Sequence, residues 1–282
     1  MKKHVPVLLQ EAVNYLNVKS GGKYIDATYG AGGHSREILQ RGGVVLGLDV
    51  SPEAVKTAEK DPNLKVVQGN FRNIGEIARK EGFGEVSGIL FDLGISSDEL
   101  SEVPGLSFQR DEPLDMRLDP GLGVTAADLV NALPESKLGE LLTEYGDEPR
   151  AKVIAREIVK ARSEKRIETT GELLRAIDQV KGRRVGRIHP ATQVFQALRI
   201  AVNDELDSLR EALPQAAELL NREGRLVVIA FHSGEDRIVK TYFSSAGLKV
   251  LTEKPITASP AEVSANLRAR SGKLRAAEKV TE

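Results

Sequence analysis

The sequence predicts an α/β fold, a doubly wound parallel sheet interrupted by an all-helical insertion. In the first hundred residues, short apolar runs alternate with helical patterns, which is typical of a parallel sheet with helices on both faces. The alternation then stops for about a hundred residues, where helical patterns follow one another. Helices without a strand do not extend a sheet, so these segments predict a separate subdomain. A chain of 282 residues is long enough for both parts.

Seven strands are expected. Within the expected strand Val44–Val50, the residues Val44–Leu48 are apolar at successive positions, as a strand covered on both faces should be. The expected buried strands are Tyr24–Thr28, Val44–Val50, Leu64–Gln68, Ser87–Leu93 and Arg225–Phe231, and Gly247–Glu253 and Lys273–Lys279 are expected to close the sheet. The helical patterns between the first four strands cover Ser35–Gln40, Pro52–Lys60 and Ile74–Glu81.

Five helical patterns make up the predicted insertion and the return to the sheet. They are Ala126–Ala132, Pro134–Tyr145, Glu148–Ser163, Thr170–Val180 and His189–Leu220, the last carrying the chain back to the sheet. We therefore expect a first sheet-forming part at 1–103, an inserted helical subdomain at 104–205, and a closing part of the sheet domain at 206–282.

Composition excludes several classes of protein. Cysteine is absent, which excludes disulfides, thiolate metal sites and cysteine nucleophiles. The four histidines have no zinc spacing, so no metal is expected. No run of ~18 apolar residues predicts a membrane span, and the N-terminus lacks the apolar core of a signal peptide. We expect a cytoplasmic protein.

The charges are unevenly distributed although the net charge is −1. The segment 150–190 carries 12 basic and 5 acidic residues, whereas 85–148 carries 3 basic and 15 acidic residues. A basic block of this size leaves room for a polyanionic partner. The alternative is a solvated basic face that lies against an acidic one.

A glycine-rich loop follows the first expected strand, in the segment Asp26–Ser35. Glycines between a strand and a helix let a ligand approach the backbone closely. Because position 35 is serine, the dinucleotide pattern G-x-G-x-x-G is incomplete. The Asp26 carboxylate would also repel a pyrophosphate but tolerate an ammonium group. The loop therefore favours S-adenosylmethionine over NAD or FAD.

Two further residues fit such a ligand. Asp49 ends the second strand 19 residues after Gly30, a spacing that fits hydrogen bonds to ribose hydroxyls. The alternative is that Asp49 caps the next helix. Phe71 follows the third strand, where its ring either stacks on an adenine or packs in the core.

Polar residues at two other strand ends are candidates for chemistry. Asp92 ends the fourth strand and is followed by Ser96 and Ser97, and His232 follows the fifth strand. Ligands of open α/β sheets bind at the carboxyl ends of the strands. An acid and hydroxyls there can accept hydrogen bonds from a substrate amine, and histidine can exchange protons near neutral pH. The alternatives are a serine or aspartate turn and a structural histidine.

The chain resembles the bacterial ribosomal RNA small subunit methyltransferase H family (RsmH, also called MraW) over nearly its whole length. The residues that carry the resemblance are His4–Leu9, Asp26–Ser35, Asp92–Ser97, Phe108, Pro113–Arg117, His189–Thr192, Phe195–Ile200, Val202–Leu206, Phe231–Ser233 with Glu235–Arg237, and Arg268–Ser271. The resemblance implies a class I S-adenosylmethionine-dependent methyltransferase with a Rossmann-like, seven-stranded sheet. It also implies methylation of the N4 amine of a decoding-centre cytidine in 16S rRNA of the small ribosomal subunit.

The same resemblance implies which residues contact S-adenosylmethionine. Carried over position by position, they are Gly32, Gly33, His34, Asp49, Phe71, Asp92 and Glu99. The family commonly has Gln where this chain has Glu99, Leu where it has Gly234, and Pro where it has Leu267. For the methyl transfer itself we expect Asp92, Ser96 and Ser97 to supply a hydrogen-bond acceptor for the amine, assisted by His232.

Basic residues of the insertion are expected to contact the RNA. Lys152, Arg156 and Lys160 recur every four residues and so share one face of a helix. Lys181, Arg183, Arg184 and Arg187 follow in a glycine-containing segment. Such groups would bind phosphates and make the affinity salt-dependent. The alternative is an amphipathic helix with solvated lysines.

Other classes of function share parts of this pattern. A Rossmann oxidoreductase would bind a nicotinamide cofactor, for which Asp26 and Ser35 are poor fits. A non-catalytic RNA-binding protein would need neither the glycine loop nor Asp49. A DNA N4-cytosine or N6-adenine methyltransferase shares the cofactor site, and only the family blocks outside that site argue against it.

Overall fold

The computed structural model describes residues 6–181 and 191–280 and consists of two compact units. One unit comprises residues 1–94 and 206–282 and contains the sheet, and the other comprises residues 95–205. No helix in the described ranges is both long enough and apolar enough to cross a membrane.

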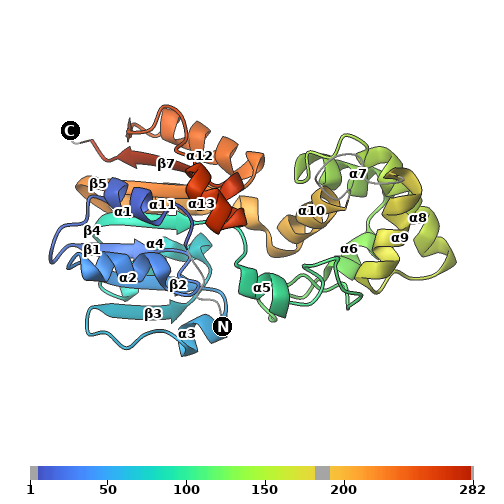
Figure 1. The fold of residues 1–282 in the computed structure, drawn as a ribbon, viewed down its shortest axis with the longest axis horizontal. Helices are drawn as coiled ribbons and strands as arrows, with labels where there is room; N and C mark the ends of the chain where they lie inside the picture. Colours follow the sequence, from blue (N-terminus) through green and yellow to red (C-terminus); the bar gives the residue numbers. More distant parts are fainter. Residues whose placement is uncertain (1–5, 182–190, 281–282) are drawn as a thin grey trace. The chain divides into compact units, whose positions relative to one another are not determined.

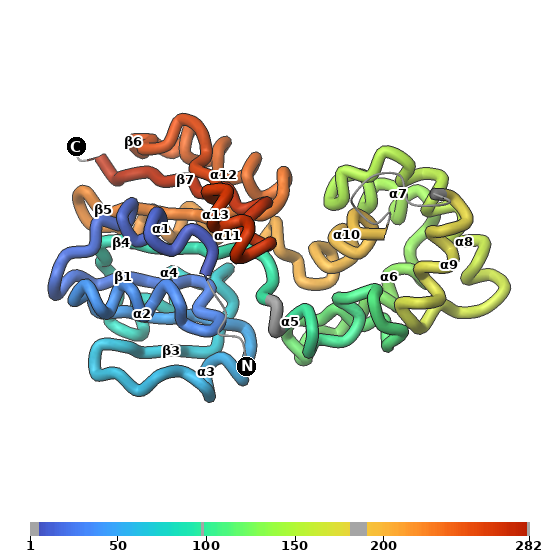
Figure 2. The backbone as a smooth tube through the Cα atoms, viewed as in Figure 1, coloured from blue at the N-terminus to red at the C-terminus, as the bar shows by residue number. Residues whose placement is uncertain are grey.

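The first unit contains a seven-stranded sheet in the order β3-β2-β1-β4-β5-β7-β6. Figure 2 shows β3, β1, β4, β5, β7 and β6 following one another in this order. Its strands are β1 (Lys23–Asp26), β2 (Val44–Asp49), β3 (Leu64–Gln68), β4 (Val86–Asp92), β5 (Leu220–Ala230), β6 (Lys249–Val250) and β7 (Lys273–Glu278). Strands β1 to β5 are parallel, and β7 is antiparallel to both β5 and β6. The predicted α/β class and its seven strands are confirmed.

Successive residues of the central strands pack on opposite faces of the sheet. Tyr24 and Leu90 join one apolar cluster with α1 (Leu9–Leu16) and α2 (Gly33–Gln40), whereas Ile25 and Phe91 join the other. The second cluster includes residues of α4 (Ile74–Lys80), α11 (Glu205–Leu219) and α12 (Ser233–Ser245). Figure 1 shows α1 and α2 together on one face. This double burial explains why β2 and β4 are apolar at successive positions.

The remaining helical elements of this unit are short. They are α3 (Pro52–Lys56), η1 (Phe71–Asn73), α13 (Pro260–Ala265) and η2 (Leu267–Ser271), where η denotes a 3₁₀ helix. Helix α3 ends four residues before the predicted Lys60 and buries none of its side chains, so no packing extends it.

The first closing strand is also shorter than predicted. Instead of Gly247–Glu253, β6 contains Lys249–Val250. Beyond it, the side chain of Thr252 replaces the backbone as partner of β7, because its Oγ1 accepts a hydrogen bond from the Ala276 N–H at 2.9 Å. Both groups are buried, so the hydroxyl satisfies a donor that water does not reach.

The second unit is built from helices. They are α5 (Ser97–Glu102), α6 (Ala126–Ala132), α7 (Glu135–Glu144), α8 (Ala151–Glu164), α9 (Thr170–Lys181) and α10 (Thr192–Asn203). One apolar cluster joins α6 to α10, with Leu142 of α7, Ile158 of α8, Ile177 of α9 and Leu198 of α10 fully buried. The unit begins at Ile95, whereas the sequence predicted residue 104, because α5 belongs to the helical unit.

The prediction of one helix over His189–Leu220 is wrong. Helix α10 ends at Asn203, Asp204 has a left-handed conformation with φ 50° and ψ 41°, and α11 then begins at Glu205. Aspartate tolerates this conformation better than most residues. The Asn203 side chain fixes the end of α10, since its Oδ1 accepts from Leu118 N–H and its Nδ2 donates to the Met116 carbonyl. Residues 189 and 190 lie outside the described part of the chain.

Replacing Thr252 by valine tests the role of its hydroxyl in the sheet. Thr252→Val keeps the shape but leaves the buried Ala276 N–H without an acceptor. We expect the free energy of unfolding to fall by about 1–3 kcal/mol, measured by urea denaturation. Thr252→Ser, which retains the hydroxyl, is the control and should lose less. Equal stability of Thr252→Val and the parent protein would contradict this role.

Candidate cofactor and active site

Three aspartates end adjacent parallel strands at the carboxyl edge of the sheet. They are Asp26 of β1, Asp49 of β2 and Asp92 of β4. The chain leaves β1 toward β2 and β3 on one side, and returns to β4 on the other. The edge between β1 and β4 is therefore the switch point at which open α/β sheets bind their ligands.

The glycine loop lies at this switch point and is tightly packed. Gly32 precedes α2 with φ 71°, and a Cβ there would lie 2.6 Å from the Tyr29 hydroxyl. At Gly33, the first residue of α2, a Cβ would lie 2.1 Å from Cγ of Pro6. Neither position has room for a side chain, because Tyr29 packs against Gly32 and Pro6 packs against Gly33.

Asp49 holds the loop rather than capping α3. Its Oδ2 accepts from Gly30 N–H at 2.7 Å, and its Oδ1 accepts from Ser51 N–H at 2.8 Å. The cap of α3 is Ser51, whose Oγ accepts from Ala54 N–H. Asp49 thus ties the end of β2 to the glycine loop, which places its carboxylate beside the loop backbone. Its contact with a ribose remains a prediction.

Asp26 is buried and already hydrogen-bonded. Its Oδ2 accepts from the Ser35 hydroxyl at 2.7 Å, and its Oδ1 accepts from Thr28 N–H at 3.3 Å. Burial raises the pKa of this carboxyl to about 6, although both hydrogen bonds lower it. Asp26 therefore fixes α2 to β1 through Ser35 and faces inward.

Asp92 has an oxygen without a partner. Its Oδ1 is inaccessible to solvent and accepts no hydrogen bond from any residue that the structure describes. The Oδ2 atom lies 3.6 Å from Nδ1 of His34, beyond a normal hydrogen bond. The backbone N–H of Asp92 donates to the Thr28 hydroxyl at 2.6 Å, which fixes the end of β4 against β1.

The surroundings of Asp92 favour its neutral form. Burial raises the pKa of its carboxyl to about 8, the positive charge of Arg268 lowers it, and the negative charges of Asp26 and Glu235 raise it further. His34 presents Nδ1 to this carboxyl, and its Nε2 lies 3.3 Å from the Val7 carbonyl oxygen. A buried acceptor of this kind is suited to a ligand that brings its own donor and positive charge.

Phe71 contacts the core, as its second alternative predicts. It begins η1 and forms a T-shaped pair with Phe91, with ring centroids 5.6 Å apart and an angle of 84° between the planes. The ring is partly buried against the apolar cluster that includes Phe91. Its stacking on an adenine remains a prediction.

His232 occupies a structural position at the start of α12. It is the N-cap, its Nδ1 accepting from Glu235 N–H at 3.5 Å, while the Glu235 carboxylate accepts from the N–H groups of Phe231 and His232. The Nε2 atom lies 3.2 Å from Oε1 of Glu235. At Gly234, where the family usually has leucine, a Cβ would lie 3.2 Å from the His232 ring. This geometry favours the structural alternative for His232.

Ser96 and Glu99 form a reciprocal cap at the start of α5 in the helical unit. Ser96 Oγ accepts from Glu99 N–H at 3.0 Å, and Glu99 Oε2 accepts from Ser96 N–H at 2.6 Å. Both side chains therefore have a structural use within their own unit. The side chain of Ser97 lies outside the described part of the structure.

The predicted basic face of α8 is exposed but partly paired with acids. Arg156 Nε lies 3.7 Å from Glu135 Oε1, and Lys160 Nζ lies 4.0 Å from Glu157 Oε2. Lys152 and Arg156 also line a groove with acidic residues of α7. The side chain of Lys181 and the residues Arg183, Arg184 and Arg187 lie outside the described part of the chain.

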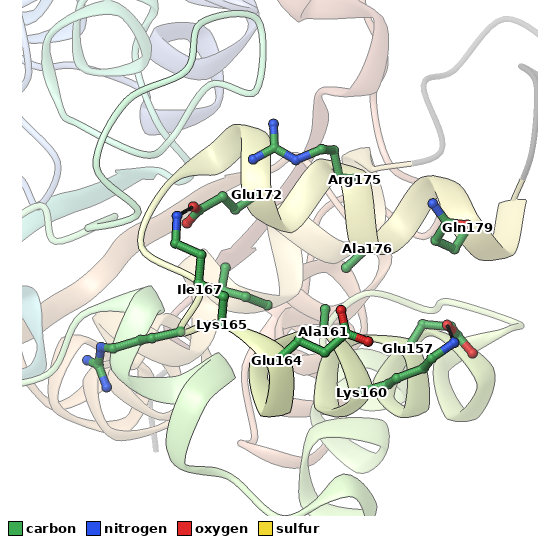
Figure 3. Close-up of a pocket in the computed structure, with 11 residues that line it drawn as sticks. Glu157, Lys160, Ala161, Glu164, Lys165, Ile167, Glu172, Arg175, Ala176 and Gln179 are labelled. Atoms are coloured by element: carbon green, nitrogen blue, oxygen red, sulfur yellow. Dashed lines mark hydrogen bonds and ion pairs between the residues drawn. The ribbon is translucent and has the colours of Figure 1, made fainter.

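Basic residues that sequence reasoning missed surround a cavity of about 370 Å³ between α8 and α9 (Figure 3). Lys160 lines it together with Lys165, Arg166 and Arg175, and three acids line it as well, namely Glu157, Glu164 and Glu172. Lys165 Nζ donates to Glu172 Oε1 at 2.6 Å, a contact visible in the figure. In the sequence, the adjacent Lys165 and Arg166 could have indicated this basic surface. They follow the expected helix, however, so helical spacing does not place them on one face with Lys160.

A doubly wound α/β unit with a glycine loop and a buried, unpartnered carboxyl oxygen at its switch point is the architecture of an enzyme that binds a nucleotide-like cofactor. Comparison with known proteins identifies the family. The model of the MraW methylase family matches residues 1–280, and the chain belongs to that family.

Named relatives support the same assignment. The chain is 48% identical to "Ribosomal RNA small subunit methyltransferase H" of Thermomicrobium roseum, covering 98% of this chain and 94% of the relative. It is 46% identical to the protein of the same name from Carboxydothermus hydrogenoformans, covering 99% and 98%. The family resemblance and the methyltransferase fold class are confirmed, which decides against an oxidoreductase.

The pKa of Asp92 predicts how stability depends on pH. A carboxyl whose pKa is raised to about 8 in the folded protein binds its proton more tightly there than in the unfolded chain, so its contribution to stability is lost as pH rises from about 4 to 8. We expect Asp92→Asn to raise the free energy of unfolding at pH 9 by roughly 2–5 kcal/mol and to change it little near pH 4. Denaturant titrations across this range measure the effect.

The control for this experiment is Asp61→Asn, which alters an exposed aspartate of the same unit. It should leave the pH profile of stability as it is in the parent protein. If Asp92→Asn and the parent had parallel profiles between pH 4 and 9, Asp92 would not be the buried acid described above.

Proposed function

We propose that this methylase transfers a methyl group from S-adenosylmethionine to the exocyclic N4 amine of a decoding-centre cytidine in 16S rRNA of the small ribosomal subunit. Three facts support the proposal. The chain belongs to a methylase family, its relatives carry the name of a small-subunit rRNA methyltransferase, and Asp92 presents a buried acceptor oxygen at the switch point. The unpartnered Asp92 oxygen carries the proposal, because it offers an acceptor to a ligand that brings a hydrogen-bond donor.

The residues at the strand edge fit the proposed cofactor. Asp49 would accept hydrogen bonds from the ribose hydroxyls, and Phe71 would stack on the adenine. Gly32, Gly33 and His34 would line the loop that approaches the cofactor. Asp92 would accept from the ammonium group of the methionine part, an interaction that favours the ionised carboxylate. Bound S-adenosylmethionine supplies an electrophilic methyl group on a sulfonium.

Glu99 is the weakest member of the predicted cofactor set. Its carboxylate already accepts the Ser96 N–H within the cap of α5, and it lies in the helical unit rather than in the sheet unit that holds the other members. A contact of Glu99 with the cofactor would require a rearrangement of that cap.

The protein has two tasks in the proposed reaction. The N4 amine is a poor nucleophile because its lone pair is delocalised into the ring, so the amine must be held in line with the methyl group. Positioning of this kind contributes up to ~7–11 kcal/mol in favourable cases. The second task is to accept a hydrogen bond from the amine N–H, which localises the lone pair, and to lead the proton away as the N–C bond forms.

Asp92, Ser96 and Ser97 are the proposed acceptors for this amine. Ser96 Oγ already accepts from Glu99 N–H, so it has one remaining acceptor position. His232 is the proposed assisting group, although its cap leaves it a positioning role for the turn after β5 rather than that of a free base.

The helical unit is proposed to hold the RNA. Lys152, Arg156 and Lys160 on α8 would contact phosphates, with Lys181, Arg183, Arg184 and Arg187 as the further predicted contacts. The basic residues around the cavity between α8 and α9 extend the same surface past Lys160. The acids paired with these residues would be displaced by phosphates, which makes the binding sensitive to salt.

Mapping of the methylated base tests the proposed reaction. Small ribosomal subunits from cells that lack this protein are incubated with it and with methyl-labelled S-adenosylmethionine, and the rRNA is digested and analysed by mass spectrometry. We expect one labelled nucleoside, N4-methylcytidine, in the decoding centre. Label on another atom or another base, or no label at all, would refute the proposal.

Charge reversal on α8 tests the RNA surface. We expect Lys152→Glu, Arg156→Glu and Lys160→Glu combined to lower the affinity for small-subunit rRNA about tenfold or more at low salt, and to reduce the slope of log K against log salt by up to ~2–3. Cofactor affinity should not change. Lys137→Glu on α7, an exposed lysine of the same unit paired with Glu140, is the control. Equal loss in the control would show a general charge effect.

A further inference from the structure

Arg268 stands at the same edge of the sheet as Asp92, although it lies far away in the sequence. It belongs to η2, and its guanidinium carbon lies 5.7 Å from the centre of the Phe231 ring, in cation–π geometry. The next residue, Ala269, is buried in the apolar cluster that includes α1. The short helix is thus anchored through Ala269, and Arg268 is held against Phe231.

Phe231 connects this arginine with the end of β4. It follows β5, whose Ile229 is the register partner of Asp92 and accepts the Leu93 N–H at 3.0 Å. A Cβ at Gly94 would lie 3.3 Å from the Phe231 ring, so the chain after Asp92 passes directly over this aromatic side chain. An arginine fixed on Phe231 is therefore fixed relative to the Asp92 carboxyl.

The charged groups that face Asp92 come from four elements. Asp26 at the end of β1 and Glu235 of α12 are negative, His34 of α2 presents Nδ1 at 3.6 Å, and Arg268 of η2 is positive. Burial and both acids favour the neutral carboxyl. Arg268 opposes them, and its guanidinium keeps its charge throughout the physiological pH range.

We propose that Arg268 is a positioning residue that stabilises the ionised form of Asp92, so that this carboxylate can accept a hydrogen bond from the cofactor ammonium or from the substrate amine. This role rests on the proposed function, since it prepares the acceptor which that reaction uses. Its planar side chain suits the site, because it can lie on Phe231 while its charge acts on the carboxyl. A lysine would keep the charge but lose the stacked geometry.

A direct titration of Asp92 tests the inference. The carboxyl carbons of aspartate are labelled with ¹³C, the Asp92 resonance is assigned by its absence in Asp92→Asn, and its chemical shift is followed from pH 5 to 10 in the protein without cofactor or RNA. We expect Arg268→Gln to raise the midpoint by roughly one pH unit and Arg268→Lys to raise it less. Arg270→Gln is the matched control, because Arg270 is an exposed arginine of the same 3₁₀ helix.

The outcomes separate this inference from the proposed function. An unchanged midpoint in Arg268→Gln, or an equal rise in Arg270→Gln, would overturn the role of Arg268. The titration needs no methyl transfer, so a wild-type protein that makes no N4-methylcytidine would refute the proposed function and leave the inference standing. Where transfer occurs, kcat/KM for the cofactor, which reports the ionisation of the free enzyme, should require a higher pH in Arg268→Gln than in Arg270→Gln, by the same shift as the midpoint.

Discussion

The burial of one carboxyl group at the end of β4 is the constraint on which the site depends. Parallel strands bring Asp26, Asp49 and Asp92 to one edge of the sheet, where three like charges oppose one another. The surroundings of the three carboxyl groups differ. Asp26 accepts a hydrogen bond from the Ser35 hydroxyl, and Asp49 accepts hydrogen bonds from two backbone N–H groups. Of the three, Asp92 retains an oxygen without a partner among the described residues.

The different hydrogen bonds of the three aspartates connect the fold with the chemistry of the site. Asp26 and Asp49 shape the glycine loop from its two ends, since one binds the side chain of α2 and the other binds the Gly30 N–H. The loop then presents its backbone beside Asp92, which is set against β1 by Thr28. A ligand that brings a positive charge and N–H donors completes the site, because it supplies the hydrogen-bond donor that no described residue gives to Asp92 Oδ1. A cofactor with an ammonium group meets both requirements.

The sheet could be predicted from the sequence because its strands are buried on both faces. Val44–Leu48 and Ile89–Phe91 are apolar at successive positions, and runs this short that alternate with helical patterns are typical of strands covered on both faces. The break at Asp204 could not be predicted, since it depends on Asn203 reaching backbone groups more than eighty residues away. The cap by His232 had a readable signal, a glutamate three residues later, but histidine is an unusual residue for that role.

Some of the candidate site residues could likewise be predicted from the sequence, and others could not. The strand-end aspartates and the glycines were predictable, because the order of strands and loops places them at one edge. Arg268 was not assigned a role, since its approach to Asp92 depends on the packing of η2 through Ala269 and on the position of Phe231. Ser96 and Glu99 were assigned to the site, but in the structure they cap α5. Only their hydrogen bonds reveal this use.

The most direct measurement is the proton release that accompanies cofactor binding. Calorimetry with S-adenosylhomocysteine at pH 7, in buffers of different ionisation enthalpy, gives the number of protons exchanged. With the pKa of free Asp92 at about 8, its carboxyl is mostly protonated at that pH and loses the proton when it meets the ligand ammonium. The account predicts a release approaching one proton per ligand, which disappears in Asp92→Asn. Tight binding by the wild type without proton release would contradict it.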